Sequence, residues 1–184
     1  MIEVKISGRG GQGAVLASQV LATAFFQKGY YVQSFPSFGA ERRGAPVSAF
    51  LRVDSKEITL RYSVQSPDWI VLFDANLLKN PMVMAGMTGK TCLLVNIGLP
   101  QGLEVQECKG LYAVDATSIA EELKLRTTSF SMVNTAMVGA FARASGLLDL
   151  ESIEKVIGEM APVKREANVA AARKAFEKVK EVSR

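Results

Sequence analysis

A glycine-rich turn near the amino terminus constrains the fold more than any other feature of the sequence. Residues 2–7 alternate apolar and polar side chains, which is the pattern of a β-strand. The segment GRGGQG follows at residues 8–13, and residues 14–29 then place apolar side chains at near-helical spacing. A strand that turns through glycines into a helix predicts a layered α/β fold.

The alternation of strands and helices continues along the chain. Residues 30–35 are predicted to form a second strand. Residues 47–54 and 57–62 are separated by two polar residues, a spacing that predicts a β-hairpin. Nearly continuous apolar runs, typical of strands buried in a parallel sheet, occur at residues 69–74, 91–98 and 111–116.

The last third of the sequence has helical patterns, at residues 129–147, 149–160 and 163–182. Asp149 is a candidate N-cap for the second of these helices. The elements together predict a layered, Rossmann-like α/β sheet with a parallel core and a β-hairpin, helices on both faces and a helical carboxy-terminal region. A length of 184 residues fits one domain, residues 1–184.

Hydropathy and charge narrow the range of partners. No apolar run approaches the roughly 18 residues of a membrane span, and the segment MIEVKISGRGG lacks a signal-peptide core, so we expect a cytoplasmic protein without a membrane partner. Residues 1–62 hold eight Lys/Arg against four Asp/Glu, whereas the remainder holds fourteen of each. This excess is typical either of a solvated surface or of a patch for phosphate or an acidic partner. Its arginines are Arg9, Arg42, Arg43, Arg52 and Arg61.

The residue types that most often carry catalysis or metal binding are scarce. Histidine is absent, and Cys92 and Cys108 are far apart and outside any C-x-x-C pair. We therefore expect no catalytic residue and no metal ligand set in this chain alone. Nucleic acid is not an expected partner, because no basic cluster interleaves with aromatic residues beyond residues 35–43.

Two interpretations of the glycine-rich turn stay open. Backbone N–H groups at the start of a helix favour an anion, and an arginine would add positive charge. Alternatively, the glycines only let the strand turn tightly into the helix. A dinucleotide site is poorly supported, because the second strand ends in Ser-Phe-Pro at residues 34–36, where an acidic ribose ligand is expected. The anion-binding candidates are Gly8, Arg9, Gly10, Gly11, Gln12 and Gly13.

Two acidic residues follow buried strands. Asp74 and Asp115 could serve a site at the carboxyl edge of the sheet. Aspartate is also a leading N-cap residue, and we favour the interpretation that each caps the next helix.

A stiff loop at residues 34–50, SFPSFGAERRGAPVSAF, carries two adjacent arginines. Its prolines fix φ and its glycines permit sharp turns, so the directions of the arginine side chains are restricted. Arginine held in this way suits bidentate recognition of a carboxylate or phosphate, which we favour over an internal pair with Glu41. The candidate residues of the loop are Phe38, Glu41, Arg42, Arg43 and Gly44.

The two motifs together are similar to those of a known family. A strand, GRGGQGAV and its helix, followed by FPSFGAERRGAPV, resemble the gamma subunits of the 2-oxoacid:ferredoxin oxidoreductases, of the pyruvate (pyruvate synthase) type. WIVLFD, LLVNIG, the strand before Asp115 and MVNTAMVGAF follow in the order expected for the family.

The resemblance implies a subunit of an enzyme that converts pyruvate, coenzyme A and oxidised ferredoxin into acetyl-CoA, CO₂ and reduced ferredoxin. It implies alpha, beta and ferredoxin-like delta subunits as partners and ferredoxin as electron acceptor. Thiamine diphosphate, Mg and [4Fe-4S] clusters would belong to the partner chains, so the chain would bind none of them alone and would be inactive alone. Residues 8–13 would then be candidates for coenzyme A, and the arginine loop would face the substrate side or a subunit interface.

Two alternatives remain at this point. The branched-chain 2-oxoacid type of the same family has gamma subunits that look alike. Outside the family, the chain could be a stand-alone nucleotide- or anion-binding α/β module, which predicts ligand affinity without a large partner.

Overall fold

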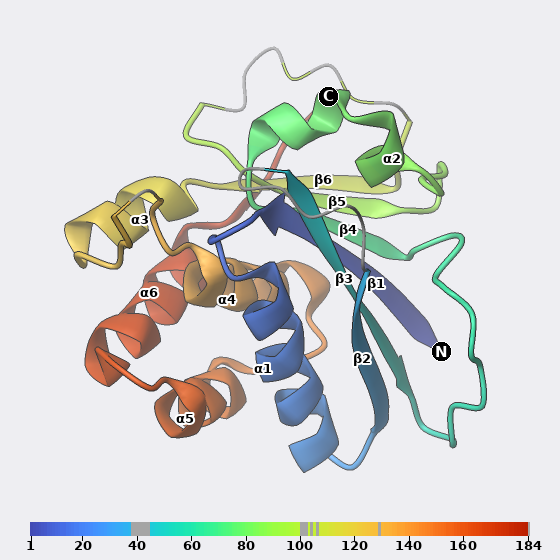
Figure 1. Ribbon diagram of the computed structural model, residues 1–184, viewed down its shortest axis with the longest axis horizontal. Helices are drawn as coiled ribbons and strands as arrows, with labels where there is room; N and C mark the ends of the chain where they lie inside the picture. The colour runs from blue at the N-terminus through green and yellow to red at the C-terminus, as the bar shows by residue number, and fades with distance from the viewer. Residues whose placement is uncertain (38–44, 100–102, 104, 106, 129, 184) are drawn as a thin grey trace.

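A mixed β-sheet runs through the molecule (Figure 1). The computed structural model describes residues 1–37, 45–99, 103, 105, 107–128 and 130–183. In these residues the sheet has seven strands in the order β2-β3-β1-β4-β5-β6-β7. The strands are β1 (Ile2–Arg9), β2 (Tyr31–Ser37), β3 (Pro46–Asp54), β4 (Trp69–Leu72), β5 (Cys92–Asn96), β6 (Gly110–Val114) and β7 (Lys180–Glu181).

The centre of the sheet is parallel, as the apolar runs predicted. Strand β1 pairs with β4, β4 with β5, and β5 with β6, all in the parallel sense. Trp69 and Val71 belong to the core on one face of β4, and Ile70 and Leu72 to the core on the other. All four side chains are buried, so no polar alternation remains in the sequence of this strand.

Helices cover both faces of the sheet, as expected, but unequally (Figure 1). The larger core lies beneath α1 (Ala14–Gln27), α3 (Ala116–Glu122), α4 (Asn134–Ser145), α5 (Leu150–Met160) and α6 (Arg165–Lys178). The short helices η1 (Ala75–Lys79) and α2 (Pro81–Met84) lie on the opposite face. Helices α4 and α6 approach closely at Gly139, which has no side chain. A Cβ there would lie only 2.1 Å from the carbonyl oxygen of Ala172.

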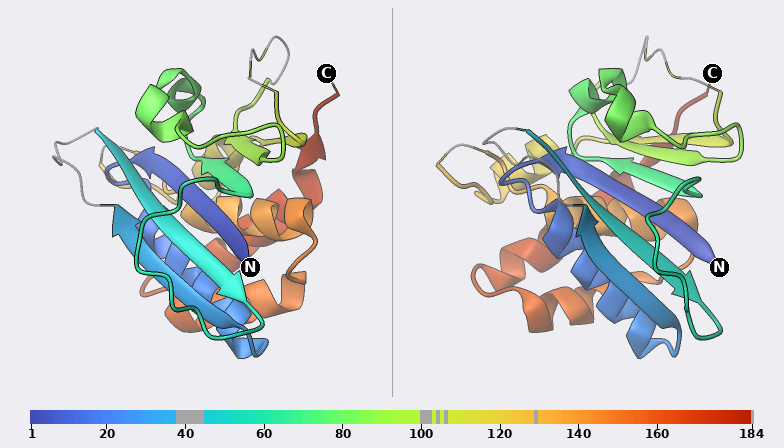
Figure 2. Two further views of the ribbon diagram at one scale, coloured as in Figure 1. Left: turned by 90° about the vertical axis from the view of Figure 1, so that its right-hand side faces the viewer. Right: turned by 45° about the vertical axis from the view of Figure 1, so that its right-hand side comes forward.

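The predicted hairpin between residues 47–54 and 57–62 is wrong. Strand β3 pairs antiparallel with β1 on one side and with β2 on the other, so neither edge is free for residues 57–62. The antiparallel pair of successive strands is instead β2 with β3. Residues 57–62 have no strand structure, and Figure 2 shows the irregular segment that contains them running along the sheet.

The helical carboxy-terminal region is confirmed with shorter helices than the patterns predicted. Helix α4 begins only at Asn134, and Arg126 and Ser131 form an isolated antiparallel bridge in the segment before it. Helix α6 ends at Lys178, and after Val179 the chain forms β7, which pairs antiparallel with β6. In the part of the chain that the structure describes, no helix combines the length and apolar character that crossing a bilayer requires.

Candidate functional site

The glycine-rich turn lies at the carboxyl end of β1 and leads into α1. Gly11 and Gly13 have φ values of 102° and 84°, in the left-handed region that favours glycine. A Cβ on Gly11 would lie 3.1 Å from the Phe130 ring, and one on Gly13 would lie 3.0 Å from Asn134. The glycines are therefore needed for the turn itself and for the close approach of Phe130 and of the start of α4.

Gln12 ties the turn to the neighbouring strand. Its side-chain Oε1 accepts a hydrogen bond from the Arg9 backbone N–H at 2.7 Å, and its Nε2 donates to the carbonyl of Phe73 at 3.4 Å. Its own N–H donates to the carbonyl of Arg9 at 3.0 Å. The turn is thus fixed against the end of β4 before any ligand binds.

The start of α1 keeps donors that could face an anion. Gly13 is its N-cap residue and supplies no side-chain cap. The first N–H groups of a helix have no partner within the helix, and the helix dipole makes this end positive. The geometry therefore fits the anion-site interpretation as well as that of a tight turn.

Arg9 is not a free charge beside this turn. Its Nε donates to Oδ2 of Asp74, which follows β4. Oδ1 of Asp74 accepts the Asn76 N–H at 2.9 Å, so the same carboxylate caps η1, as favoured from the sequence. Burial raises the pKa of Asp74, but the hydrogen bonds from Arg9 and Asn76 outweigh it, and the pKa is lowered overall. The carboxylate balances the charge that the sequence suggested Arg9 would offer to an anion.

Asp115 also acts as a helix cap. Its Oδ1 accepts the Ser118 N–H at 2.9 Å at the start of α3. Asn96, at the end of β5, was missed by the sequence reasoning. Its Nδ2 donates to Phe73 O at 2.9 Å, and its Oδ1 accepts the Ala116 N–H at 2.9 Å. The polar residue that ends the apolar run CLLVN was the available signal.

The flanks of the arginine loop lie beside the glycine turn. Pro46 of β3 pairs with Arg9 of β1, and the Gly10 N–H donates to Ala45 O at 3.3 Å. At the other flank, Ser37 of β2 pairs with Ser48 of β3, so both flanks of the loop lie at the sheet edge that carries the turn. The loop residues Phe38, Glu41, Arg42, Arg43 and Gly44 lie outside the described residues.

Arg52 does not belong to a surface patch, although it contributes to the positive charge of the first third. Its side chain is 0% exposed and its Nε donates to Glu3 Oε1 at 2.7 Å. The guanidinium also lies 5.6 Å from the Phe35 ring centroid and 5.2 Å from that of Tyr62. It is a buried, paired group of the sheet face opposite α1.

Neither Cys92 nor Cys108 is exposed. Among the residues that the structure describes, no three acidic or cysteine side chains gather in a way that could hold a metal ion.

The family model for pyruvate ferredoxin/flavodoxin oxidoreductase matches residues 3–178. The chain belongs to this family. Pyruvate synthase subunit PorC of Methanothermobacter thermautotrophicus is 43% identical over 184 residues, covering 99% of this chain and 98% of the relative. The pyruvate/ketoisovalerate oxidoreductases common subunit gamma of Pyrococcus abyssi is 44% identical over 187 residues, covering 97% of each chain.

A solved member of the family has the same fold. The crystal structure of pyruvate oxidoreductase subunit PORC from Thermotoga maritima matches with a TM-score of 0.82 at 36% identity. The match covers 99% of this chain and 98% of the other. The resemblance drawn from the glycine turn and the arginine loop is confirmed at the level of the family.

Proposed function

We propose that the chain is the gamma subunit of a multi-subunit pyruvate:ferredoxin oxidoreductase, the pyruvate synthase type. The observation that carries this proposal is the 43–44% identity, over essentially the whole chain, to subunits named for that activity. The complex would oxidatively decarboxylate pyruvate with coenzyme A to acetyl-CoA and CO₂ and reduce ferredoxin. Residues 1–184 would act as one unit of a cytoplasmic assembly.

We assign the redox and decarboxylation chemistry to the partner subunits. Alpha, beta and ferredoxin-like delta chains would hold thiamine diphosphate, Mg and the [4Fe-4S] clusters. This chain would shape the substrate and coenzyme A side of the active centre. Its described residues suit that role through a turn held rigid by Gln12 and a helix start whose N–H groups could meet a phosphate of coenzyme A.

A second candidate substrate has specific support. The Pyrococcus abyssi relative is named as a subunit common to pyruvate and ketoisovalerate oxidoreductases. A branched-chain 2-oxoacid complex could therefore use the same subunit. Purifying the complex with a tagged copy of this chain, and assaying pyruvate and ketoisovalerate separately, distinguishes one activity from two. Absence of both activities, with no iron-containing partner in the purified material, would reject the function.

The role of the arginine loop has its own test. An Arg42→Ala/Arg43→Ala double variant should raise the KM for coenzyme A or reduce co-purification of the partners. The double variant Lys56→Ala/Arg61→Ala is a matched control, because it removes the same charge from two exposed positions of the same third of the chain. Equal kinetics and equal assembly of the two double variants would remove Arg42 and Arg43 from the proposed role.

A further inference from the structure

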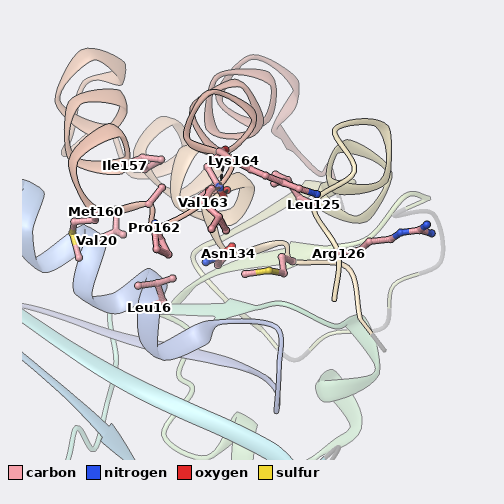
Figure 3. A pocket seen from close by; sticks show the side chains of 14 residues that line it. Leu16, Val20, Leu125, Arg126, Asn134, Ile157, Met160, Pro162, Val163 and Lys164 are labelled. Carbon is pink, nitrogen blue, oxygen red and sulfur yellow. Dashed lines mark hydrogen bonds between the residues drawn. The ribbon is translucent and has the colours of Figure 1, made fainter. Parts of the chain in front are cut away.

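A cavity lies between the helices behind the glycine turn (Figure 3). Its volume is about 130 Å³. Helices α1, α4, α5 and α6 and the segments before α4 and α6 form its wall. The apolar residues that line it include Leu16, Val20, Leu125, Met132, Ile157 and Met160.

Size and lining together define what the cavity could hold. An engineered apolar cavity of about 150 Å³ in another protein binds benzene. A cavity of similar size, lined mainly by aliphatic side chains, therefore suits one ring or a short branched chain. Water is a poor occupant, because a buried water needs two to four polar partners.

One polar group in the wall lacks a partner. Asn134, the first residue of α4, is 2% exposed, and its Oδ1 accepts no hydrogen bond within the described part of the chain. The neighbouring polar groups satisfy one another, since Thr135 Oγ1 donates to Asn168 Oδ1 at 3.1 Å and Asn168 Nδ2 donates to Val163 O at 3.1 Å. A buried polar atom without a hydrogen-bond partner is rare in folded proteins. The Asn134 oxygen therefore indicates that a bound molecule supplies a donor at this position.

Among the described residues that line the cavity, only Arg126 and Lys164 are charged, and neither directs its charge inward. Figure 3 shows the Arg126 side chain extending away from the other lining residues. Lys164 Nζ donates to the carbonyl of Lys124. A charged ligand would therefore lose its hydration without gaining an ionic partner.

We propose that this cavity is a binding site for a small neutral molecule that is apolar over most of its surface and carries one hydroxyl group, with the size of phenol. The apolar part fills the space between α1 and α5. The hydroxyl pairs with the Asn134 carboxamide, and it suits either end of that amide because a hydroxyl both donates and accepts.

Phenol and toluene form a matched pair of probes, because they differ by one hydroxyl in place of one methyl. Titrating each into the full chain, with methyl NMR signals of Leu16, Val20, Ile157 and Met160 as the readout, locates any binding. Phenol should shift these signals. Asn134→Leu should weaken phenol binding about tenfold, the effect of losing one hydrogen bond, and should strengthen toluene binding.

A second pair of variants keeps the proposal open to disproof if Asn134→Leu does not fold. Ala161 lines the cavity and is only partly exposed, so Ala161→Leu should fill the space and abolish binding of both probes. Ala144 is also partly exposed but is not among the lining residues, so Ala144→Leu should leave binding unchanged. Phenol binding that persists in Ala161→Leu, shifts confined to other residues, or no phenol binding at all would overturn the proposal.

Discussion

Arg9, the last residue of β1, donates its Nε to the carboxylate of Asp74, which lies two residues beyond the end of the neighbouring β4. The ion pair therefore joins two parallel strands at the edge where the glycine turn begins. Side-chain exposures of 37% and 18% place it partly in solvent. Its contribution to the free energy of unfolding is therefore small, because solvent partly screens the two charges.

Replacing Asp74 with asparagine tests this pair. Asp74→Asn keeps an N-cap side chain for η1 but removes the charge that Arg9 contacts. We expect a loss of about 1 kcal/mol in the free energy of unfolding near neutral pH, measured by urea denaturation. An Arg9→Gln/Asp74→Asn double-mutant cycle should show that the two losses do not add.

The stability difference between wild type and Asp74→Asn should also depend on pH. The folded-state pKa of Asp74 is lowered, so its contribution is present above its unfolded pKa of about 3.9 and is lost as pH falls through the folded value. The difference between wild type and Asp74→Asn should therefore shrink in acid. A difference that stays constant from neutral pH into acid would contradict the ion-pair account.

The left-handed glycines of the turn should resist substitution. Gly11→Ala and Gly13→Ala each force a Cβ into positive φ and towards Phe130 or Asn134, so each should destabilise the fold by about 1–2 kcal/mol. Gly158→Ala is the control, because it lies within α5 and a Cβ there meets nothing within 4 Å. That variant should be neutral or more stable by up to about 1 kcal/mol.

Gly139 should be the most sensitive glycine of the helical layer. An alanine Cβ would lie 2.1 Å from the Ala172 carbonyl oxygen. This oxygen belongs to the helix backbone, which cannot turn aside as a flexible side chain could. Gly139→Ala should therefore push α4 and α6 apart and cost more than about 2 kcal/mol, or prevent folding. Thermal unfolding of Gly139→Ala beside Gly158→Ala checks this, and equal stability of the two would refute the close contact.

Asp149 combines a helix cap with an ion pair that two substitutions separate. Its Oδ1 accepts the Ser152 N–H at 2.8 Å, and its Oδ2 accepts from Lys28 Nζ. Asp149→Ala should cost about 1 kcal/mol through loss of the cap. Asp149→Asn keeps a capping oxygen and loses only the exposed pair, so chemical denaturation should show a smaller loss. Equal losses in the two variants would mean that the ion pair, and not the cap, carries the stability.

Local features of the fold could be predicted from the sequence. The glycine turn, the buried strands and the caps at Asp74, Asp115 and Asp149 each depend on residues close together in the chain. Their patterns therefore contain the physical cause of the structure, whether burial on two faces or a side chain within reach of a helix start.

Features that depend on distant partners could not be predicted in this way. Residues 57–62 alternate like a strand, but β1 and β2 occupy both edges of β3. Arg52 looks like a surface charge until Glu3 is placed beside it. Asn134 sits in an apolar helical pattern, and its relation to Gly13 appears only once α1 and α4 pack together.

The insertion of β3 between β1 and β2 has a consequence for any molecule that docks at the carboxyl edge of the sheet. The turn after β1 lies beside Ala45 and Pro46, and Ser37 ends β2 on the same edge of the sheet, so both anchor points of the connection between β2 and β3 are near the turn. A partner surface that binds the glycine turn therefore also meets the residues at which the connection between β2 and β3 begins and ends. Substitutions in the turn or in the connection can therefore change partner binding while the paired strands β1, β2 and β3 stay unchanged.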